Sequence, residues 1–203
     1  AVWTVSFGDI DGDGEGEVVA GIGGPLGGHI QAFRKDGSSV TGFPVNVGKY
    51  PMSPTLSDLD DNGTMEIILG TRTGQAFVYK GDGTVYPGWP IQMDRYVGAS
   101  ASAGDVNNDG IMDVVMESRN LLYVWNKDGQ LLPGFPFAIL DSLVGSNSYS
   151  APVLVDLTGD GKLEIVFCSH SDVTNAGGII YGVKHDGTNL PGFPKTVPNW
   201  IYG

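Results

Sequence analysis

Short apolar runs alternate with polar, glycine-rich segments along the whole chain. Clear examples are residues 66–70 (EIILG), 113–117 (DVVME) and 164–168 (EIVFC). Short runs bounded by glycine and aspartate are typical of strands, and their nearly continuous apolarity indicates burial on both faces. Nowhere do apolar residues recur at i, i+3, i+4 and i+7 for more than about one helical turn. The pattern therefore predicts an all-β protein.

The apolar runs belong to an internal repeat of about 50 residues. Each run follows an aspartate-rich stretch, and the first aspartates of these stretches are Asp9, Asp58, Asp105 and Asp156, spaced by 49, 47 and 51 residues. A second element recurs in phase with the first: an Asp-Gly pair whose aspartate lies six residues before the glycine of a Gly-aromatic-Pro sequence. Asp-Gly between apolar segments is a strong hairpin signal, because both residues tolerate positive φ. Four copies in register indicate a repeat architecture.

Each repeat is expected to form four antiparallel strands. In the second repeat these are residues 53–57, 65–70, 75–80 and 84–90, so the fourth includes the Gly-aromatic-Pro sequence. Four short strands per repeat are typical of a β-propeller blade. The chain is thus expected to be a single repeat domain, residues 1–203, with approximate blades 1–44, 45–90, 91–136 and 137–203. We expect the array to continue beyond this chain or across a subunit contact. The recurring aromatic residues Phe43, Trp89, Phe135 and Phe193 are expected to pack between blades.

The aspartate-rich stretches have the spacing of cation-binding loops. Counted from the first aspartate, oxygen-bearing side chains recur at positions 1, 3, 5 and 9, glycine occupies position 6, and position 7 would offer a main-chain carbonyl. Such oxygens converge on a hard cation, and their number and irregular geometry favour Ca²⁺ over Mg²⁺. The expected metal-binding residues are Asp9, Asp11, Asp13, Glu15 and Glu17; Asp58, Asp60, Asn62, Thr64 and Glu66; Asp105, Asn107, Asp109, Ile111 and Asp113; and Asp156, Thr158, Asp160, Lys162 and Glu164. About four Ca²⁺ ions are predicted.

An EF-hand is excluded as the source of this spacing. Its loop needs a bidentate glutamate at position 12, between two helices. Position 12 here holds Ala20, Leu69, Met116 and Phe167, all apolar and within strand-like runs.

The charge balance limits the classes of partner. The chain has 23 Asp and Glu against 11 Lys and Arg, a formal charge of -12, so nucleic acid and anionic membranes should repel it. No apolar run approaches the ~20 residues of a membrane-spanning helix. The three histidines lack zinc-ligand spacing, and the single Cys168 is expected to be a small buried side chain.

The pattern D-x-[DNT]-x-[DN]-G-x-x-[DE], followed by an apolar strand and a hairpin, resembles the FG-GAP and VCBS-type repeats. These occur in the β-propeller of integrin α subunits and in many microbial secreted and surface proteins. The resemblance implies a calcium-stabilised propeller with Ca²⁺ between the first two strands of each blade. Thr158, at position 3 of the last loop, departs from the usual acidic or amide residue, and family propellers commonly have about seven blades.

The function expected from these features is that of a non-catalytic, extracellular or cell-surface module. It would serve adhesion, binding of an extracellular glycan or protein, or surface assembly, including self-association through blade faces. The alternative is an accessory propeller of a larger secreted hydrolase, lyase or peptidase. No Ser/His/Asp order, Cys/His pair or nucleophile elbow is evident. Segments of variable length between the second and third strands, residues 22–29, 71–74, 118–120 and 169–178, mark the edge where a ligand is expected.

Overall fold

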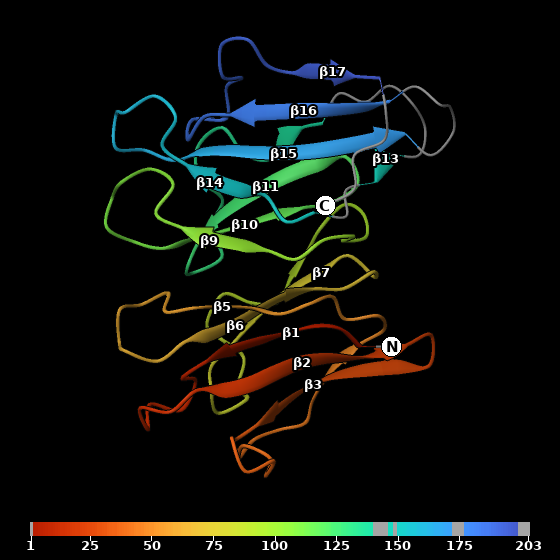
Figure 1. Cartoon of the computed structure of the whole chain (residues 1–203), viewed down its shortest axis with the longest axis vertical. Coiled ribbons are helices and arrows are strands. Elements are labelled where there is room, and N and C mark those ends of the chain that lie inside the picture. The colour runs from red at the N-terminus through yellow and green to blue at the C-terminus, as the bar shows by residue number, and fades with distance from the viewer. Residues whose placement is uncertain (1, 140–145, 148–149, 172–176, 199–203) are drawn as a thin grey trace.

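The chain folds into four antiparallel β-sheets that follow one another in sequence (Figure 1). The computed structural model describes residues 2–139, 146–147, 150–171 and 177–198. Within these residues there is no helix, and hence none long and apolar enough to cross a membrane. The prediction of an all-β protein with four sheets is confirmed.

Sheets 1 and 2 have four strands each, in sequence order across the sheet. Sheet 1 comprises β1 (Val2–Gly8), β2 (Glu17–Gly24), β3 (Gly27–Phe33) and β4 (Val45–Gly48). Sheet 2 comprises β5 (Thr55–Ser57), β6 (Glu66–Gly70), β7 (Gln75–Tyr79) and β8 (Ile91–Gln92).

Sheet 3 repeats this order, whereas the first strand of sheet 4 is divided in two. Sheet 3 comprises β9 (Ser102–Gly104), β10 (Asp113–Glu117), β11 (Leu121–Asn126) and β12 (Phe137–Ala138). Sheet 4 comprises β13 (Ser146–Asn147), β14 (Val153–Val155), β15 (Glu164–Ser171), β16 (Gly178–Val183) and β17 (Lys195–Val197). Both β13 and β14 pair with β15, so this sheet has five strands where four were predicted.

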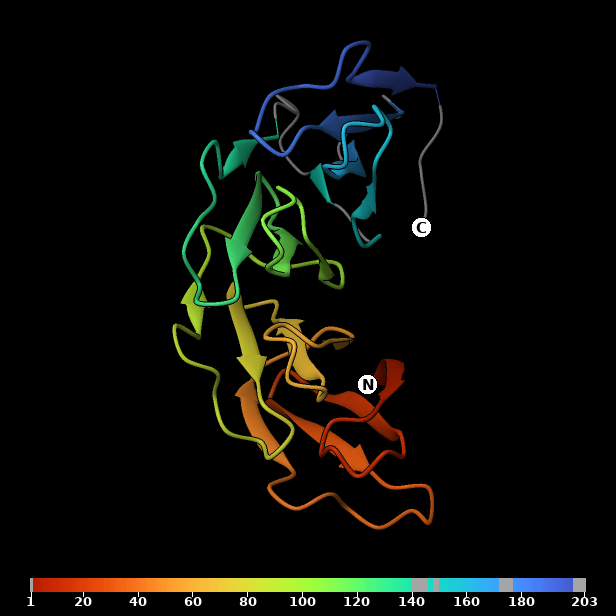
Figure 2. The same ribbon diagram turned by 90° about the vertical axis from the view of Figure 1, so that its left-hand side faces the viewer.

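The sheets are arranged along an arc (Figure 2). The first strands of consecutive sheets lie side by side, β1 against β5, β5 against β9 and β9 against β14. The chain then moves outward across each sheet to the fourth strand before it returns to the next first strand. This succession of sheets around a common inner edge is the arrangement expected of blades.

The prediction for the fourth strand was wrong in its position. In sheet 2 the fourth strand is β8, which follows the Gly-Trp-Pro sequence, while Val85 before it makes only an isolated bridge to Tyr79. Strands β4, β12 and β17 likewise begin directly after Pro44, Pro136 and Pro194. Glycine at positive φ followed two residues later by proline, which has no N–H to donate, interrupts the ladder there. The strand forms only once the chain has passed the proline.

Among the residues that the structure describes, the hydrophobic core forms three clusters, each between two neighbouring sheets. The first joins sheets 1 and 2 and includes Val19, Ile30, Ile67 and Leu69, all fully buried. The second joins sheets 2 and 3, and the third joins sheets 3 and 4. The inner strands of sheets 2 and 3 therefore bury both faces, as their continuous apolar runs predict.

Three of the four recurring aromatic residues pack in these clusters, as predicted. Phe43, Trp89 and Phe135 are each at most 9% exposed and belong to the first, second and third clusters. The Trp89 indole also donates to the main-chain oxygen of Lys127 in the next sheet, at 2.9 Å. Phe193 has no following sheet within the described residues and is only partly buried.

Candidate metal centres

The four aspartate-rich loops lie on one edge of the molecule, each between the first and second strands of a sheet. In Figure 1 they project along the left side, after β1, β5, β9 and β14. We call them loop 1 (9–16), loop 2 (58–65), loop 3 (105–112) and loop 4 (156–163).

All four loops fold around the carboxylate of their first aspartate. One oxygen of this carboxylate accepts the N–H of the position-6 glycine, at 2.9 Å in loop 1, 2.8 Å in loops 2 and 3, and 2.9 Å in loop 4. These glycines have φ between 84° and 88°, a conformation that side chains disfavour. The position-5 side chain accepts the next N–H, as Asp13 does from Glu15 at 2.8 Å. Positions 1, 5 and 6 thus set the loop conformation.

The acid at position 9 begins the second strand and is buried in every sheet. Glu17, Glu66, Asp113 and Glu164 are each at most 1% exposed. Each accepts the N–H of the position-2 residue, at 2.8–3.1 Å. Burial raises the pKa of the Glu17 and Glu66 carboxyls, and the neighbouring aspartates raise it further. Burial raises the pKa of Asp113 to about 7. A buried carboxylate near other carboxylates is costly unless a cation compensates it.

In loops 1 and 2, three carboxylates converge. One oxygen each from Asp9, Asp11 and Glu17 lies within 4.8 Å of the others, and Asp58, Asp60 and Glu66 form the equivalent cluster. Three carboxylates at such separations repel one another, and hard oxygen ligands of this kind suit a divalent cation. These two clusters could hold a metal ion.

Loop 3 has only two of these three acids, because position 3 is Asn107. The Asn107 amide donates to Asp109 at 2.9 Å, and its oxygen accepts the Asp109 N–H at 3.0 Å. One oxygen of Asp113, Oδ1, is fully buried and has no hydrogen-bond partner. Buried polar atoms nearly always have a partner, so this oxygen fits a bound cation.

In loop 4, the buried acid Glu164 receives more hydrogen bonds from the loop itself. Thr158, at position 3, donates its N–H to Glu164 Oε2 at 3.2 Å, and its hydroxyl lies 3.5 Å from Glu164 Oε1. The oxygens that an ion would use are therefore already partly engaged.

The side chains at position 7 turn to other partners. Glu15 pairs with Lys35, the Thr64 hydroxyl donates to Asn62 Oδ1 at 2.5 Å, and Lys162 Nζ lies 3.0 Å from His185 Nε2. Ile111 has no side-chain ligand atom. This leaves the main-chain carbonyl as the group that position 7 can offer to an ion.

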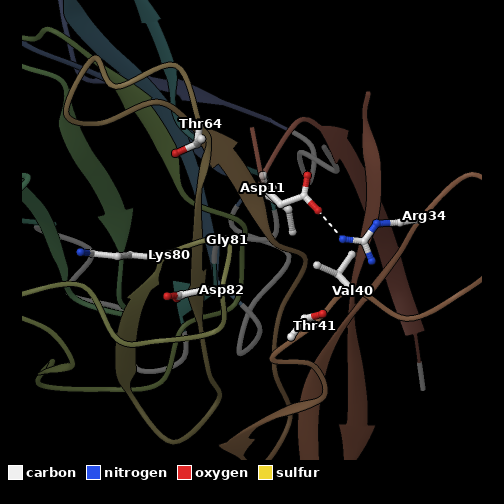
Figure 3. A pocket seen from close by; sticks show the side chains of 9 residues that line it. Asp11, Arg34, Val40, Thr41, Thr64, Lys80, Gly81 and Asp82 are labelled. Atoms are coloured by element: carbon white, nitrogen blue, oxygen red, sulfur yellow. Dashed lines mark hydrogen bonds and ion pairs between the residues drawn. The ribbon is translucent and has the colours of Figure 1, made fainter. Parts of the chain in front are cut away.

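Two further contacts at position 3 were not predicted from the sequence. Arg34 forms an ion pair with Asp11, and the Tyr86 hydroxyl donates to Asp60 Oδ2 at 3.1 Å. The Asp11–Arg34 pair lines a cavity of about 340 Å³ between sheets 1 and 2, into which Val40 and Thr41 also project (Figure 3). Lys80 is the counterpart of Arg34 in the next repeat, but it points away from this pair. A basic residue lies two positions before the Asp-Gly turn in three of the four repeats, as Arg34, Lys80 and Lys184. This recurrence is the sequence signal that could have indicated an ion pair with the loop.

The strand ends opposite the four aspartate-rich loops carry arginine–tyrosine pairs. The Arg72 guanidinium lies 5.9 Å from the Tyr50 ring centroid, and Arg119 lies 5.9 Å from that of Tyr96. Arg72 also lines a cavity of about 250 Å³ together with Thr4 of β1, Met52 and Ser53 before β5, and residues 98–100 before β9. Arg72 and Arg119 belong to the variable segments identified from the sequence. The longest of those segments includes residues 172–176, which lie outside the described residues.

Comparisons with known proteins agree with this architecture. A family model for the FG-GAP-like repeat matches residues 58–116, which run from loop 2 into β10, and confirms the predicted resemblance over that stretch. No curated protein matches the chain. Among solved structures, the computationally designed Ika8 protein is similar, with 15% identity and a TM-score of 0.56, over 97% of this chain and 51% of that one. The V. cholerae biofilm matrix protein Bap1 aligns with 19% identity and a TM-score of 0.45, over 91% and 38%. The chain therefore spans about half the length of the designed protein and a smaller share of Bap1.

Proposed function

We propose that this chain, which carries FG-GAP-like repeats, is a calcium-stabilised extracellular β-propeller module for adhesion or ligand binding, without catalytic activity of its own. The observation that supports calcium best is the buried, unpartnered Oδ1 of Asp113, the first residue after loop 3. It occurs beside the loop with fewer converging acids, where repulsion among carboxylates alone would not demand an ion.

Calcium would act as a clamp between the first two strands of each sheet. Position 9 belongs to the second strand, whereas positions 1 and 3 follow the first, so an ion bound to all three would join both strand ends. It would also neutralise the repulsion among the acids of loops 1 and 2. About four ions are proposed, one for each loop.

We assign ligand binding to the edge opposite the calcium loops. On a chain with a net charge of -12, two neighbouring sheets there present Arg72 and Arg119 beside Tyr50 and Tyr96. Aromatic rings provide apolar faces and guanidinium groups recognise carboxylates or sulfates. The chemistry favours an extracellular glycan with acidic groups, and the calcium loops on the other edge would remain free of it.

The calcium proposal is tested by titrating chelator-treated protein with Ca²⁺ and with Mg²⁺ by isothermal calorimetry. The chain offers a matched pair of variants, because Asp60 lies in the acidic cluster of loop 2, whereas its exposed neighbour Asp61 does not. We expect Ca²⁺ to bind more tightly than Mg²⁺, Asp60→Asn to weaken one site and Asp61→Asn to bind as wild type. Equal effects of both variants, or no heat of Ca²⁺ binding, would contradict the proposal.

The ligand edge is tested separately on an array of acidic and neutral glycans. Arg72→Gln and Arg119→Gln are expected to weaken binding to acidic glycans. Lys195→Gln, at the first residue of the outer strand β17, is the charge-matched control.

A further inference from the structure

The three junctions between sheets share a close main-chain contact. The glycine of each Gly-aromatic-Pro sequence lies against the Asp-Gly turn of the next sheet. A Cβ added to Gly42, Gly88 or Gly134 would lie 1.9–2.1 Å from the main-chain oxygen of Asp82, Asp128 or Asp186, respectively. Only glycine permits this approach, so the contact is a defining feature of a junction.

The two halves of one more such contact lie unused at opposite ends of the arc. Gly192 in sheet 4 is the counterpart of the three junction glycines, and Gly37 in sheet 1 belongs to the counterpart of the three turns. Within the described residues, a Cβ added to either glycine would meet nothing within 4 Å. Sheet 4 thus presents the glycine of a junction without a facing turn, and sheet 1 presents a turn without a facing glycine.

A side-chain hydroxyl that donates a hydrogen bond at the three junctions is replaced by valine in sheet 4. The hydroxyls of Ser6, Thr55 and Ser102, each three residues before a first aspartate, donate to the main-chain oxygens of Pro54, Ala101 and Pro152 in the next sheet. The residue at the donor position in sheet 4 is Val153, and the residue at the acceptor position in sheet 1 is Val5. These valines are 58% and 56% exposed.

The sizes of the side chains also change in matching places. At two junctions, apolar side chains of the next sheet cover a glycine, as Leu56 and Met65 cover Gly8. Sheet 4 has Val155 where Gly8 and Gly104 stand in sheets 1 and 3. Conversely, sheet 1 has Gly16 where Met65 stands in sheet 2, and the 71% exposed Phe7 ring lies over Gly16. Bulk is added on the sheet 4 face by Val155, whereas on the sheet 1 face the Phe7 ring takes the place of the side chain missing at Gly16.

From these features we infer that the outer face of sheet 1 binds the outer face of sheet 4 in a second copy of this chain, so that two copies close head to tail. A second copy supplies both missing halves, because its sheet 1 would bring the Gly37 turn to Gly192 and place Val5 and Phe7 opposite Val153 and Val155. The two contacts are equivalent, and ring closure satisfies both ends of both copies. The alignment of this chain with about half of the designed Ika8 chain is compatible with such a closure.

The test is sedimentation equilibrium of the full chain in calcium over a range of concentrations. Wild type is expected to form a dimer, and Val5→Lys or Val153→Lys should each weaken it at least tenfold, because each places a charge in a dry contact. Leu26→Lys is the control, since Leu26 is fully exposed in the β2–β3 turn and lies outside both faces. Circular dichroism spectra should match wild type for all three. A wild-type monomer at every concentration would overturn the inference, as would equal weakening by Leu26→Lys.

Disulfide trapping distinguishes the other arrangements. In a Cys168→Ser background, the pair Val5→Cys and Val153→Cys should yield covalent dimers under oxidation. A ladder of longer species would refute closure by two copies, and a disulfide formed within one chain would indicate that the four sheets close on themselves.

Discussion

Loops 1 and 2 differ from loops 3 and 4 in the residue at position 3, although all four loops have positive φ at positions 4 and 6. Position 3 is aspartate in the first pair and Asn107 or Thr158 in the second. Three carboxylates converge in loops 1 and 2, whereas loop 3 leaves one buried oxygen without a partner and loop 4 supplies Thr158 to the buried acid.

This comparison separates what shapes the loop from what tunes its affinity. The position-6 glycine donates its N–H to the first aspartate in all four loops. The other oxygen of that aspartate accepts the N–H of position 4 in loops 1 and 4 and that of position 5 in loops 2 and 3, a difference that does not follow the residue at position 3. Position 3 therefore changes the charge that an ion meets without changing the hydrogen bond between the first aspartate and the position-6 glycine. We expect loops 1 and 2 to gain most from calcium and loop 4 to gain least.

The largest expected effect is that of removing calcium from all four loops. A site held at ~100 times its dissociation constant contributes about 2.7 kcal/mol, so four sites supply much of a typical domain's ~5–15 kcal/mol. Chelation should lower the melting temperature measured by calorimetry and by circular dichroism at strand wavelengths. An unchanged melting temperature would refute a structural role for calcium.

Removing one site at a time should reproduce the difference between the loops. We expect Asp9→Ala, Asp58→Ala, Asp105→Ala and Asp156→Ala each to abolish one site, with a loss of about 2–3 kcal/mol for the tighter sites. Asp156→Ala should remove the weakest. Calcium titrations of the four variants, compared singly, measure the order. If Asp156→Ala removes the tightest site, the ranking is wrong while the structural role stands.

The stability of the calcium-free protein should fall as pH rises from about 4 to about 7. The Asp113 carboxyl, with an ordinary value of 3.8, has its pKa raised by burial to about 7 in the folded chain. The folded state thus binds more protons than the unfolded state in this window, and the slope is at most about 1.4 kcal/mol per pH unit for this group. Glu17 and Glu66 shift in the same direction.

Urea unfolding in chelator at several pH values measures this slope. Asp113→Asn should reduce it, and added calcium should stabilise the wild type more at the upper end of the window than at the lower. A slope of the opposite sign, or one that Asp113→Asn leaves unchanged, would contradict the assignment.

The smallest expected effect is the conversion of loop 3 toward loop 2 by Asn107→Asp. The third carboxylate should tighten calcium binding by about tenfold or less, which is about 1.4 kcal/mol, and should lower the stability of the calcium-free protein. Asp60→Asn should do the reverse in loop 2. If both substitutions change affinity in the same direction, position 3 is not the distinguishing ligand.

The sequence predicted the features that depend on spacing. The four sheets, the position of the loops between first and second strands, and the burial of Phe43, Trp89 and Phe135 follow from periodic patterns that local chemistry imposes on every repeat. The fourth strands were misplaced, because their two to four residues have no pattern of their own and form only by pairing with the third strand.

Contacts between distant residues were beyond the sequence pattern. The pairing of Arg34 with Asp11 depends on how closely the end of β3 approaches loop 1, and the Tyr86 contact to Asp60 depends on the turn after β7. The division of the first strand of sheet 4 into β13 and β14 arises from pairing to the long β15, which spacing alone does not reveal.

The three core clusters have a consequence for cooperativity. Each cluster lies between two sheets, and none lies within a single sheet. The stability of the fold therefore comes mainly from contacts between neighbouring sheets, as in a one-dimensional chain of interacting units. Such a chain loses least when an end unit frays and most when an inner unit melts, because an inner unit has two couplings and an end unit has one. Hydrogen exchange should therefore be fastest in sheets 1 and 4 of a lone chain, and joining the ends would give every unit the protection of an inner one.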